Sequence, residues 1–180
     1  MRIYPEQTLA LVVDVQERLL PHISEHEKLL NDMAKLIKGL KLLDIPFLLN
    51  EQYPKGIGTT VQPIKTLLDS SEPFEKVTFS CCKNDTTMDS IIQKKKKFII
   101  VFGIETHVCV LQTVIDLLEV GYIPILVTDC VGSRKEADKT IALQRMIQAG
   151  AIPVTLESLL FELCVSAKNS AFKEISKLVK

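Results

Sequence analysis

Residues 98–109, FIIVFGIETHVC, give the clearest indication of the fold class. The first part, Phe98 to Ile104, is apolar almost throughout and rich in Val and Ile. Continuous apolarity of this length is typical of a strand buried on both faces of a parallel sheet. Polar residues follow, and the apolar segment Val108 to Val120 then predicts a helix that stops at Gly121. The stretch therefore predicts a buried strand, a turn and a helix.

Further strands are predicted on both sides of this unit. Apolar runs of the same kind are Leu9 to Val13, Ile123 to Val127 and the shorter Pro46 to Leu49. Phe74 to Phe79 alternates less cleanly, and Ala151 to Val154 is a sixth strand.

Helical patterns lie between the strands. Two capping-box matches, Ser24-x-x-Glu27 and Ser133-x-x-Glu136, predict helix starts, and the second opens a helix over Ala137 to Ala149 that stops at Gly150. Phe161 to Leu178 predicts one or two closing helices. Strands that alternate with helices imply βαβ units. We therefore predict an α/β fold, a three-layer doubly wound and roughly six-stranded parallel sheet with helices on both faces, as one domain over residues 1–180.

Composition excludes several classes of function. Lys plus Arg and Asp plus Glu both number 22, so a net charge of zero gives no electrostatic case for nucleic acid or an anionic membrane surface. The run Lys94 to Lys97 is interpreted as a solvated helix end. The N-terminus lacks the apolar stretch of a signal peptide, and no apolar run approaches the ~18 residues that span a bilayer. We expect a cytoplasmic protein with no membrane partner.

Cysteine and histidine usage points the same way. The odd count of five cysteines, without a secretory signal, predicts reduced thiols. No Cys-x-x-Cys occurs, and the three histidines form no recognisable zinc ligand set, so we expect no metal and no cofactor. Cys130 and Cys164 lie in apolar surroundings and are predicted to be core residues, and the adjacent pair Cys81 and Cys82 is interpreted mainly as local packing.

Ligands of open α/β sheets bind beyond the carboxyl ends of the strands, so polar residues there are the candidates for chemistry. Asp14 follows the first strand, Lys76 lies in the third, and Cys109 follows the fourth. Thr106 is a plausible N-cap that places Cys109 in the first helical turn, where unpaired N–H groups and the helix dipole lower a thiol pKa and hold an oxyanion. The alternative for Cys109 is a small buried apolar residue.

The other candidates also have two interpretations. Asp14 is either the general base for the thiol or a capping or turn aspartate. Lys76 is either an ammonium that stabilises the thiolate or a solvated lysine on an edge strand. His107 lies near Cys109 and is either a base or a residue of the pocket rim.

These residues occur in motifs of a known family. The segments Leu11 to Gln16, Phe74 to Ser80 and Gly103 to Val110 resemble the isochorismatase-like cysteine hydrolases, which include nicotinamidases. Two further segments, Asn50 to Gly58 and Asp129 to Arg134, are similar to a subgroup known as isochorismatase-domain proteins. The resemblance implies a Cys109–Asp14–Lys76 triad and a cis peptide at Ile104-Glu105. It also implies an oxyanion hole made by the backbone N–H groups of Glu105 and Cys109, and assembly as a homo-oligomer.

One departure from the nicotinamidase pattern affects the expected substrate. Nicotinamidases carry an Asp-x-His metal site near the end of strand two, where this sequence has Asn50-Glu51-Gln52. Oxygen ligands here would hold a hard cation only weakly, which puts the nicotinamidase reaction in doubt. Isochorismate hydrolysis needs no thiol, so the presence of Cys109 with Lys76 favours nucleophilic amide chemistry.

We therefore predict a small-molecule hydrolase that cleaves an amide or related C–N bond through a thioester on Cys109. Gln16, Tyr53 and Phe79 are the candidates for the walls of the substrate pocket. Two alternatives are a binding or scaffold protein that keeps the fold, and a thiol redox sensor that pairs Cys109 with Cys81 or Cys82.

Overall fold

Six parallel strands form one sheet in the order β3-β2-β1-β4-β5-β6 in the computed structural model, which describes residues 1–68 and 71–180. All five strand pairings are parallel. The order reverses between β1 and β4, and in doubly wound folds a ligand crevice forms at such a switch point. The strands are β1 (Thr8–Val13), β2 (Phe47–Gln52), β3 (Phe74–Lys76), β4 (Phe98–Ile104), β5 (Ile123–Gly132) and β6 (Ile152–Val154).

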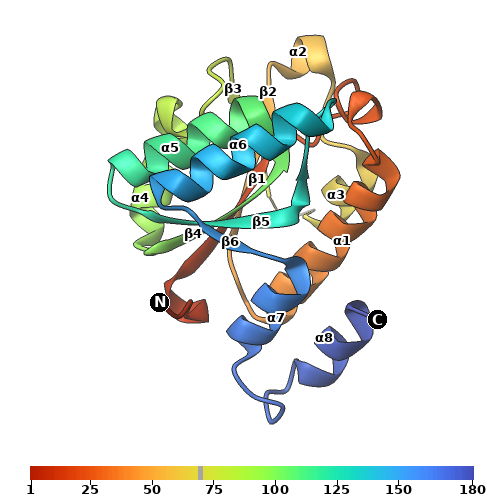
Figure 1. Cartoon of the computed structure of the whole chain (residues 1–180), viewed down its shortest axis with the longest axis vertical. Helices are drawn as coiled ribbons and strands as arrows, with labels where there is room; N and C mark the ends of the chain where they lie inside the picture. The colour runs from red at the N-terminus through yellow and green to blue at the C-terminus, as the bar shows by residue number, and fades with distance from the viewer. Residues whose placement is uncertain (69–70) are drawn as a thin grey trace.

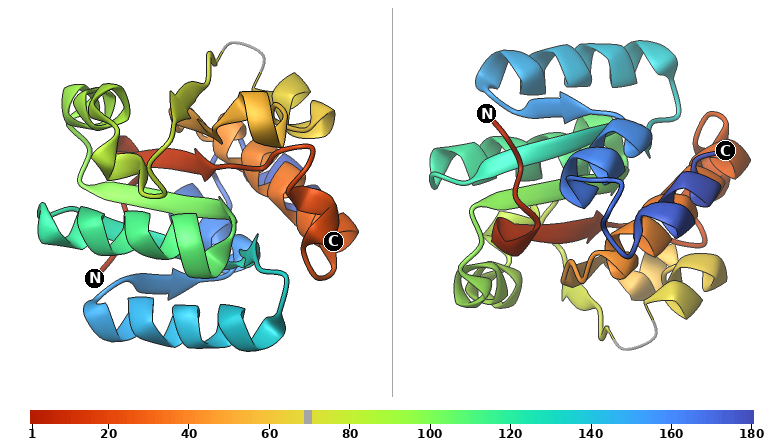
Figure 2. Two further views of the ribbon diagram at one scale, coloured as in Figure 1. Left: turned by 90° about the horizontal axis from the view of Figure 1, so that it is seen from above. Right: turned by 90° about the horizontal axis from the view of Figure 1, so that it is seen from below.

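Helices cover both faces of the sheet, with α4, α5 and α6 on one face and α1, α7 and α8 on the other (Figures 1 and 2). This confirms the predicted three-layer α/β class. None of the described helices is long and apolar enough to cross a membrane. The helices are α1 (His26–Leu42), α2 (Pro54–Ile57), α3 (Gln62–Leu67), α4 (Asp85–Lys94), α5 (Leu111–Glu119), α6 (Glu136–Ala149), α7 (Leu156–Cys164) and α8 (Phe172–Leu178).

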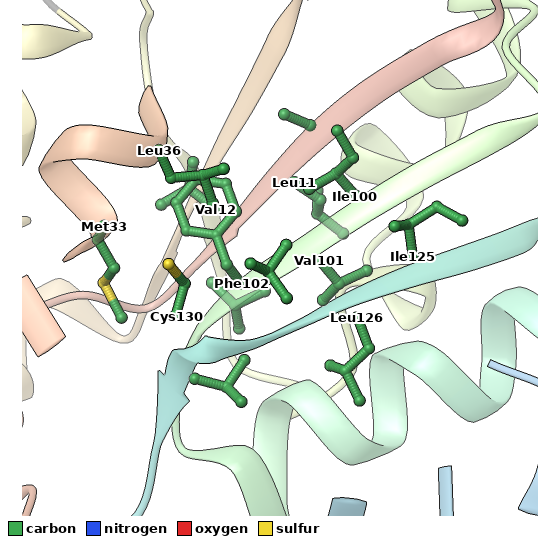
Figure 3. Close-up of a cluster of buried hydrophobic side chains, with 14 of the residues drawn as sticks. Leu11, Val12, Met33, Leu36, Ile100, Val101, Phe102, Ile125, Leu126 and Cys130 are labelled. Atoms are coloured by element: carbon green, nitrogen blue, oxygen red, sulfur yellow. The ribbon is translucent and has the colours of Figure 1, made fainter. Parts of the chain in front are cut away.

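The core is built from the central strands. Every residue of β1 and β4 is buried, as expected for strands with helices on both sides. Figure 3 shows Met33 and Leu36 of α1 facing Phe102 of β4. Cys130 and Cys164 are buried in this core, which confirms their predicted place.

Strand ends differ from the sequence prediction in ways that matter for the site. The third strand ends at Lys76 rather than at Phe79, because the chain turns there and its carbonyl groups fold back onto the Lys76 side chain. The second strand continues to Gln52, so Asn50-Glu51-Gln52 lies within the sheet. The fifth strand continues to Gly132 through a register shift opposite Val101 and Gly103.

Both predicted capping boxes are wrong. Helix α1 begins at His26 after Glu25, and α6 begins at Glu136 after Lys135, in each case without a side-chain cap. Ser133 instead pairs its hydroxyl with His107. A capping box does occur at Thr155 and Ser158, and it starts α7 five residues before the predicted Phe161. The helix stops near Gly121 and at Gly150 are confirmed.

Candidate active site

Three strand ends bring Asp14, Lys76 and Cys109 together. The Lys76 Nζ atom lies 2.7 Å from Asp14 Oδ2, and both side chains are fully buried. Cys109 lies close enough to the same carboxylate that each group shifts the pKa of the other. Residues 62 and 95 positions away from Asp14 in the chain thus meet it at the switch point of the sheet.

The end of β1 is shaped to present Asp14. Its backbone has a φ of 53°, in the left-handed region, and its N–H donates to the Asn50 carbonyl at 3.2 Å. Aspartate tolerates this region better than most residues. Gly103 on neighbouring β4 has a φ of 127°, and a side chain there would clash with the Val13 carbonyl. A glycine is therefore required for β4 to approach β1 beside Asp14.

Lys76 is held as an ammonium. Its Nζ atom donates toward four oxygens: Asp14 Oδ2 at 2.7 Å, Gln52 Oε1 at 2.8 Å, Phe79 O at 3.0 Å and Thr78 O at 3.3 Å. An ammonium has three protons to donate and no acceptor, so this all-acceptor shell matches the charged form. Burial is the largest single effect and opposes the charge, but Asp14, Cys81 and Cys109 together outweigh it, so the pKa of Lys76 is raised. The solvated edge-strand interpretation of Lys76 is therefore wrong.

Asp14 has one oxygen left for a proton. Oδ2 faces Lys76, while Oδ1 is buried and has no hydrogen-bond partner among the described residues. Burial raises the pKa of Asp14, and Lys76 opposes that shift. A carboxylate with a raised pKa and an open oxygen is suited to take up a proton.

The thiol behaves differently from the expectation of a lowered pKa. Burial and the neighbouring Asp14 carboxylate raise the pKa of Cys109, and the opposing effect of Lys76 is smaller. A second negative charge beside Asp14 is unfavourable in a site with little water. Burial and the Asp14 carboxylate thus favour a neutral thiol over a preformed thiolate.

Cys109 lies in an unusual turn after β4. The Ile104-Glu105 peptide is cis, as the family resemblance implies, and residues Thr106–Val110 form a π-helical turn that leads into α5. The Glu105 carbonyl accepts hydrogen bonds from the N–H groups of Val108 and Val110. Glu105 occupies the N-cap position, so the expectation of a Thr106 cap is wrong, although Cys109 does lie in the first turn.

Sequence reasoning missed Gln52 as part of this site. Its side-chain oxygen accepts from Lys76, and its amide nitrogen donates to Val77 O at 2.9 Å. Gln16 anchors Gln52: its Oε1 accepts from the Gln52 backbone N–H at 2.7 Å, and its Nε2 donates to Gln52 O at 2.9 Å. Gln16 is fully buried, and its role as a substrate contact stays a prediction. Gln52 lies opposite its parallel partner Lys76, a register that no local sequence pattern signals.

Tyr53 and Phe79 flank the triad lysine. The Tyr53 N–H donates to the Lys76 carbonyl, and both aromatic side chains are about half exposed. Tyr53 borders a groove of about 350 Å³ that reaches Lys76. Phe79 borders another groove, of about 380 Å³, whose lining includes Leu111 of α5. Their roles as substrate contacts stay predictions.

The residues at the end of β2 do not fit a metal site. Glu51 Oε1 accepts from the N–H and hydroxyl of Thr60 at 2.7 Å each, and Asn50 Oδ1 accepts from Thr87. Gln52 is committed to Lys76. Within residues 1–68 and 71–180 no cluster of His, Cys, Asp or Glu is suited to hold a metal ion. We derive no catalytic step through a metal.

The remaining thiols and His107 lie outside the triad. Burial raises the pKa values of Cys81 and Cys82 to about 12, which does not favour reactive thiolates. The His107 Nδ1 atom lies 2.9 Å from the Ser133 hydroxyl.

A thiol, a carboxylate and an ammonium lie together at the carboxyl edge of a parallel α/β sheet, and comparison with known proteins identifies the family of the chain. Residues 8–158 match the family model for the isochorismatase domain. Isochorismatase domain-containing protein 2A of Mus musculus is 37% identical and aligns with 99% of this chain and 85% of its own length. Isochorismatase family protein 1B of Dictyostelium discoideum is 35% identical and aligns with 99% of this chain and 89% of its own length. The chain belongs to the isochorismatase family of hydrolases.

Solved structures agree with this assignment. The MAR1 ribonuclease of Caenorhabditis elegans is 39% identical, with a TM-score of 0.93 over 99% of this chain and 92% of its own. The YcaC protein of Escherichia coli is described as an octameric hydrolase of unknown specificity. It has a TM-score of 0.94 at 24% identity and covers 99% of this chain and 90% of its own. The second likeness supports the fold.

Proposed function

We propose that this hydrolase cleaves a small amide or a related C–N bond, with Cys109 as nucleophile, Asp14 as general base and acid, and Lys76 as the electrostatic partner of both. The observation that carries this proposal is the fully buried Lys76–Asp14 pair, whose carboxylate also interacts with the Cys109 thiol. A buried ion pair carries a desolvation penalty, and such pairs are therefore candidates for functional sites. This pair lies beside a potential nucleophile.

The first step couples proton transfer to attack. As the Cys109 sulfur approaches the substrate carbonyl carbon, its proton moves to Asp14, so no free thiolate is needed. The raised pKa of Asp14 narrows its gap to the raised pKa of the thiol, which makes this transfer less unfavourable. Lys76 keeps its charge when Asp14 takes up the proton, because its three other oxygen partners are neutral acceptors that do not change in this step.

The tetrahedral intermediate then places its negative charge on the former carbonyl oxygen. The backbone N–H groups of Glu105 and Cys109 are the proposed donors to that oxygen. Asp14 returns its proton to the leaving nitrogen, the C–N bond breaks, and a thioester remains on Cys109. Asp14 then takes a proton from the water that attacks the thioester, the C–S bond breaks, and Asp14 returns the proton to the Cys109 sulfur as the acid product leaves and ionises.

A screen of small amides with intact-protein mass spectrometry tests this proposal. The wild-type protein should turn over at least one amide and carry a covalent acyl group, and Cys109→Ala should lose both. Cys82→Ala is the matched control, because it removes a half-buried thiol outside the triad. Turnover that survives in Cys109→Ala would contradict the mechanism.

RNA belongs in the same screen, because the similar C. elegans protein carries the name ribonuclease. The proposed thioester requires a carbonyl carbon, which a phosphodiester lacks. We therefore expect no cleavage of a single-stranded RNA oligonucleotide that depends on Cys109. Cleavage lost in Cys109→Ala and kept in Cys82→Ala would replace amides with RNA as the substrate class.

We also propose that the chain assembles as a homo-oligomer, as the family resemblance implies. Size-exclusion chromatography with light scattering measures the mass directly, and a monomer of 20.2 kDa would contradict this expectation.

A further inference from the structure

Ser133 and Arg134, which follow β5, bind the turn that carries Cys109. The Arg134 guanidinium binds the Glu105 carboxylate through both of its oxygens, with Nε–Oε1 at 2.9 Å and Nη2–Oε2 at 3.2 Å. The adjacent Ser133 hydroxyl contacts His107 Nδ1 at 2.9 Å. Ser133 is itself fixed, because it is buried and its carbonyl accepts from the Ser24 N–H at 3.1 Å. Two consecutive side chains thus hold two residues of the turn.

Glu105 creates an electrostatic problem for the proposed reaction. Its side chain is only 7% exposed, and its own backbone N–H is a proposed donor to the oxyanion. An uncompensated carboxylate this close would repel the negative charge that develops on the substrate oxygen. Lys76 is committed to Asp14, which leaves Arg134 as the cation that neutralises Glu105.

We propose that Arg134 is a positioning residue for the oxyanion hole: it neutralises the Glu105 carboxylate and fixes the turn that carries the Glu105 and Cys109 N–H groups. This inference rests on the proposed Cys109 chemistry and deepens it. The arrangement also assigns a role to Ser133 and Arg134, the last two residues of the Asp129 to Arg134 motif. Neither residue belongs to the triad. Because Arg134 is 59% exposed, it can be replaced without opening the core.

Two reagents that react with the same sulfur separate this role from a general structural one. p-Nitrophenyl acetate acylates a thiol through a tetrahedral oxyanion and releases p-nitrophenolate. Iodoacetamide alkylates a thiol by displacement of iodide at a methylene carbon, with no tetrahedral oxyanion. We expect Arg134→Met to slow acylation by at least about tenfold, while alkylation of Cys109 stays within about twofold of wild type.

The matched control is Lys135→Met, which removes the same charge one residue later from an exposed side chain. It should leave acylation within about twofold of wild type. Arg134→Lys keeps the charge without the two-pronged contact and should fall between wild type and Arg134→Met. Adding Glu105→Gln to Arg134→Met removes the unpaired carboxylate. The double variant should recover at least about half of the loss in the logarithm of the acylation rate, so that a tenfold loss becomes about threefold.

Several outcomes would overturn the inference. Equal slowing of both reagents by Arg134→Met would show a structural effect on the turn, and no rescue by Glu105→Gln would exclude the charge effect. An acylation rate in Arg134→Met equal to wild type would exclude the role altogether. Acylation that persists in Cys109→Ala would instead mean that the proposed nucleophile is wrong, a failure distinct from these three.

Discussion

Two ion pairs lie at the proposed active site and differ in how far they are buried. The Lys76–Asp14 pair spans 2.7 Å with both side chains fully buried, whereas the Arg134–Glu105 pair spans 2.9 Å with its arginine 59% exposed. A third pair, Lys28–Asp32 on the surface of α1, spans the same 2.7 Å as the buried pair. Distance therefore does not distinguish the three pairs, and burial does. Their expected energies differ because water screens an exposed charge and is absent from a buried one.

Removing one partner of the buried pair should have the largest effect. Lys76→Met leaves the Asp14 carboxylate buried without its counter-ion, so we expect the free energy of unfolding to fall by about 3–5 kcal/mol. Urea denaturation measures this change. The double variant Asp14→Asn/Lys76→Met removes both charges and should be more stable than Lys76→Met alone. A loss below about 1 kcal/mol in the single variant would show that the pair is not isolated from water.

Asp14→Asn should separate reactivity from turnover. Asp14 raises the pKa of Cys109 and Lys76 lowers it, so removal of the carboxylate should lower that pKa and speed alkylation by iodoacetamide at neutral pH. Wild-type alkylation should be slow at neutral pH and should accelerate as the pH rises toward the raised pKa of the thiol.

The same variant lacks the group that activates water, so steady-state release of product from p-nitrophenyl acetate should fall by about 10²–10³ while the first acylation persists. Stopped-flow absorbance resolves the two phases. Asp32→Asn, which removes a carboxylate from the α1 surface, is the control and should change neither phase. Slower alkylation in Asp14→Asn than in wild type would contradict the assigned electrostatics.

The surface pair should contribute least. Lys28 is 67% exposed, and Lys28→Ala should lower the free energy of unfolding by only about 0.3–0.5 kcal/mol, an effect that salt reduces further. Urea denaturation at low and high salt checks this value. A loss above about 1 kcal/mol would mean that the three pairs do not rank by burial.

Much of this site follows from local sequence. The apolar runs predicted the strands, and the rule that ligands bind beyond carboxyl strand ends selected Asp14, Lys76 and Cys109 as candidates. Family motifs then joined the three into one triad. The cis peptide at Ile104-Glu105 also came from that resemblance, and the structure contains it.

Predictions failed where a side chain had a more distant partner. The Ser133-x-x-Glu136 pattern fits a capping box, yet the Ser133 hydroxyl pairs with His107, which is 26 residues away. Gln52 was considered only as a departure from a metal motif, and its contact with Lys76 was not foreseen. Such contacts depend on strand order and register, which local patterns do not encode.

Local sequence predicted the strand and helix pattern and the residue type of the proposed nucleophile, because apolar periodicity and residue type are local properties. The pKa of the thiol, in contrast, depends on the folded structure. Burial around Cys109 and the nearby Asp14 carboxylate raise the thiol pKa more than Lys76 lowers it, opposite to the effect expected from a helix start alone. The physical reason is that a pKa depends on every charge and on the water within several ångströms, and only folding sets these.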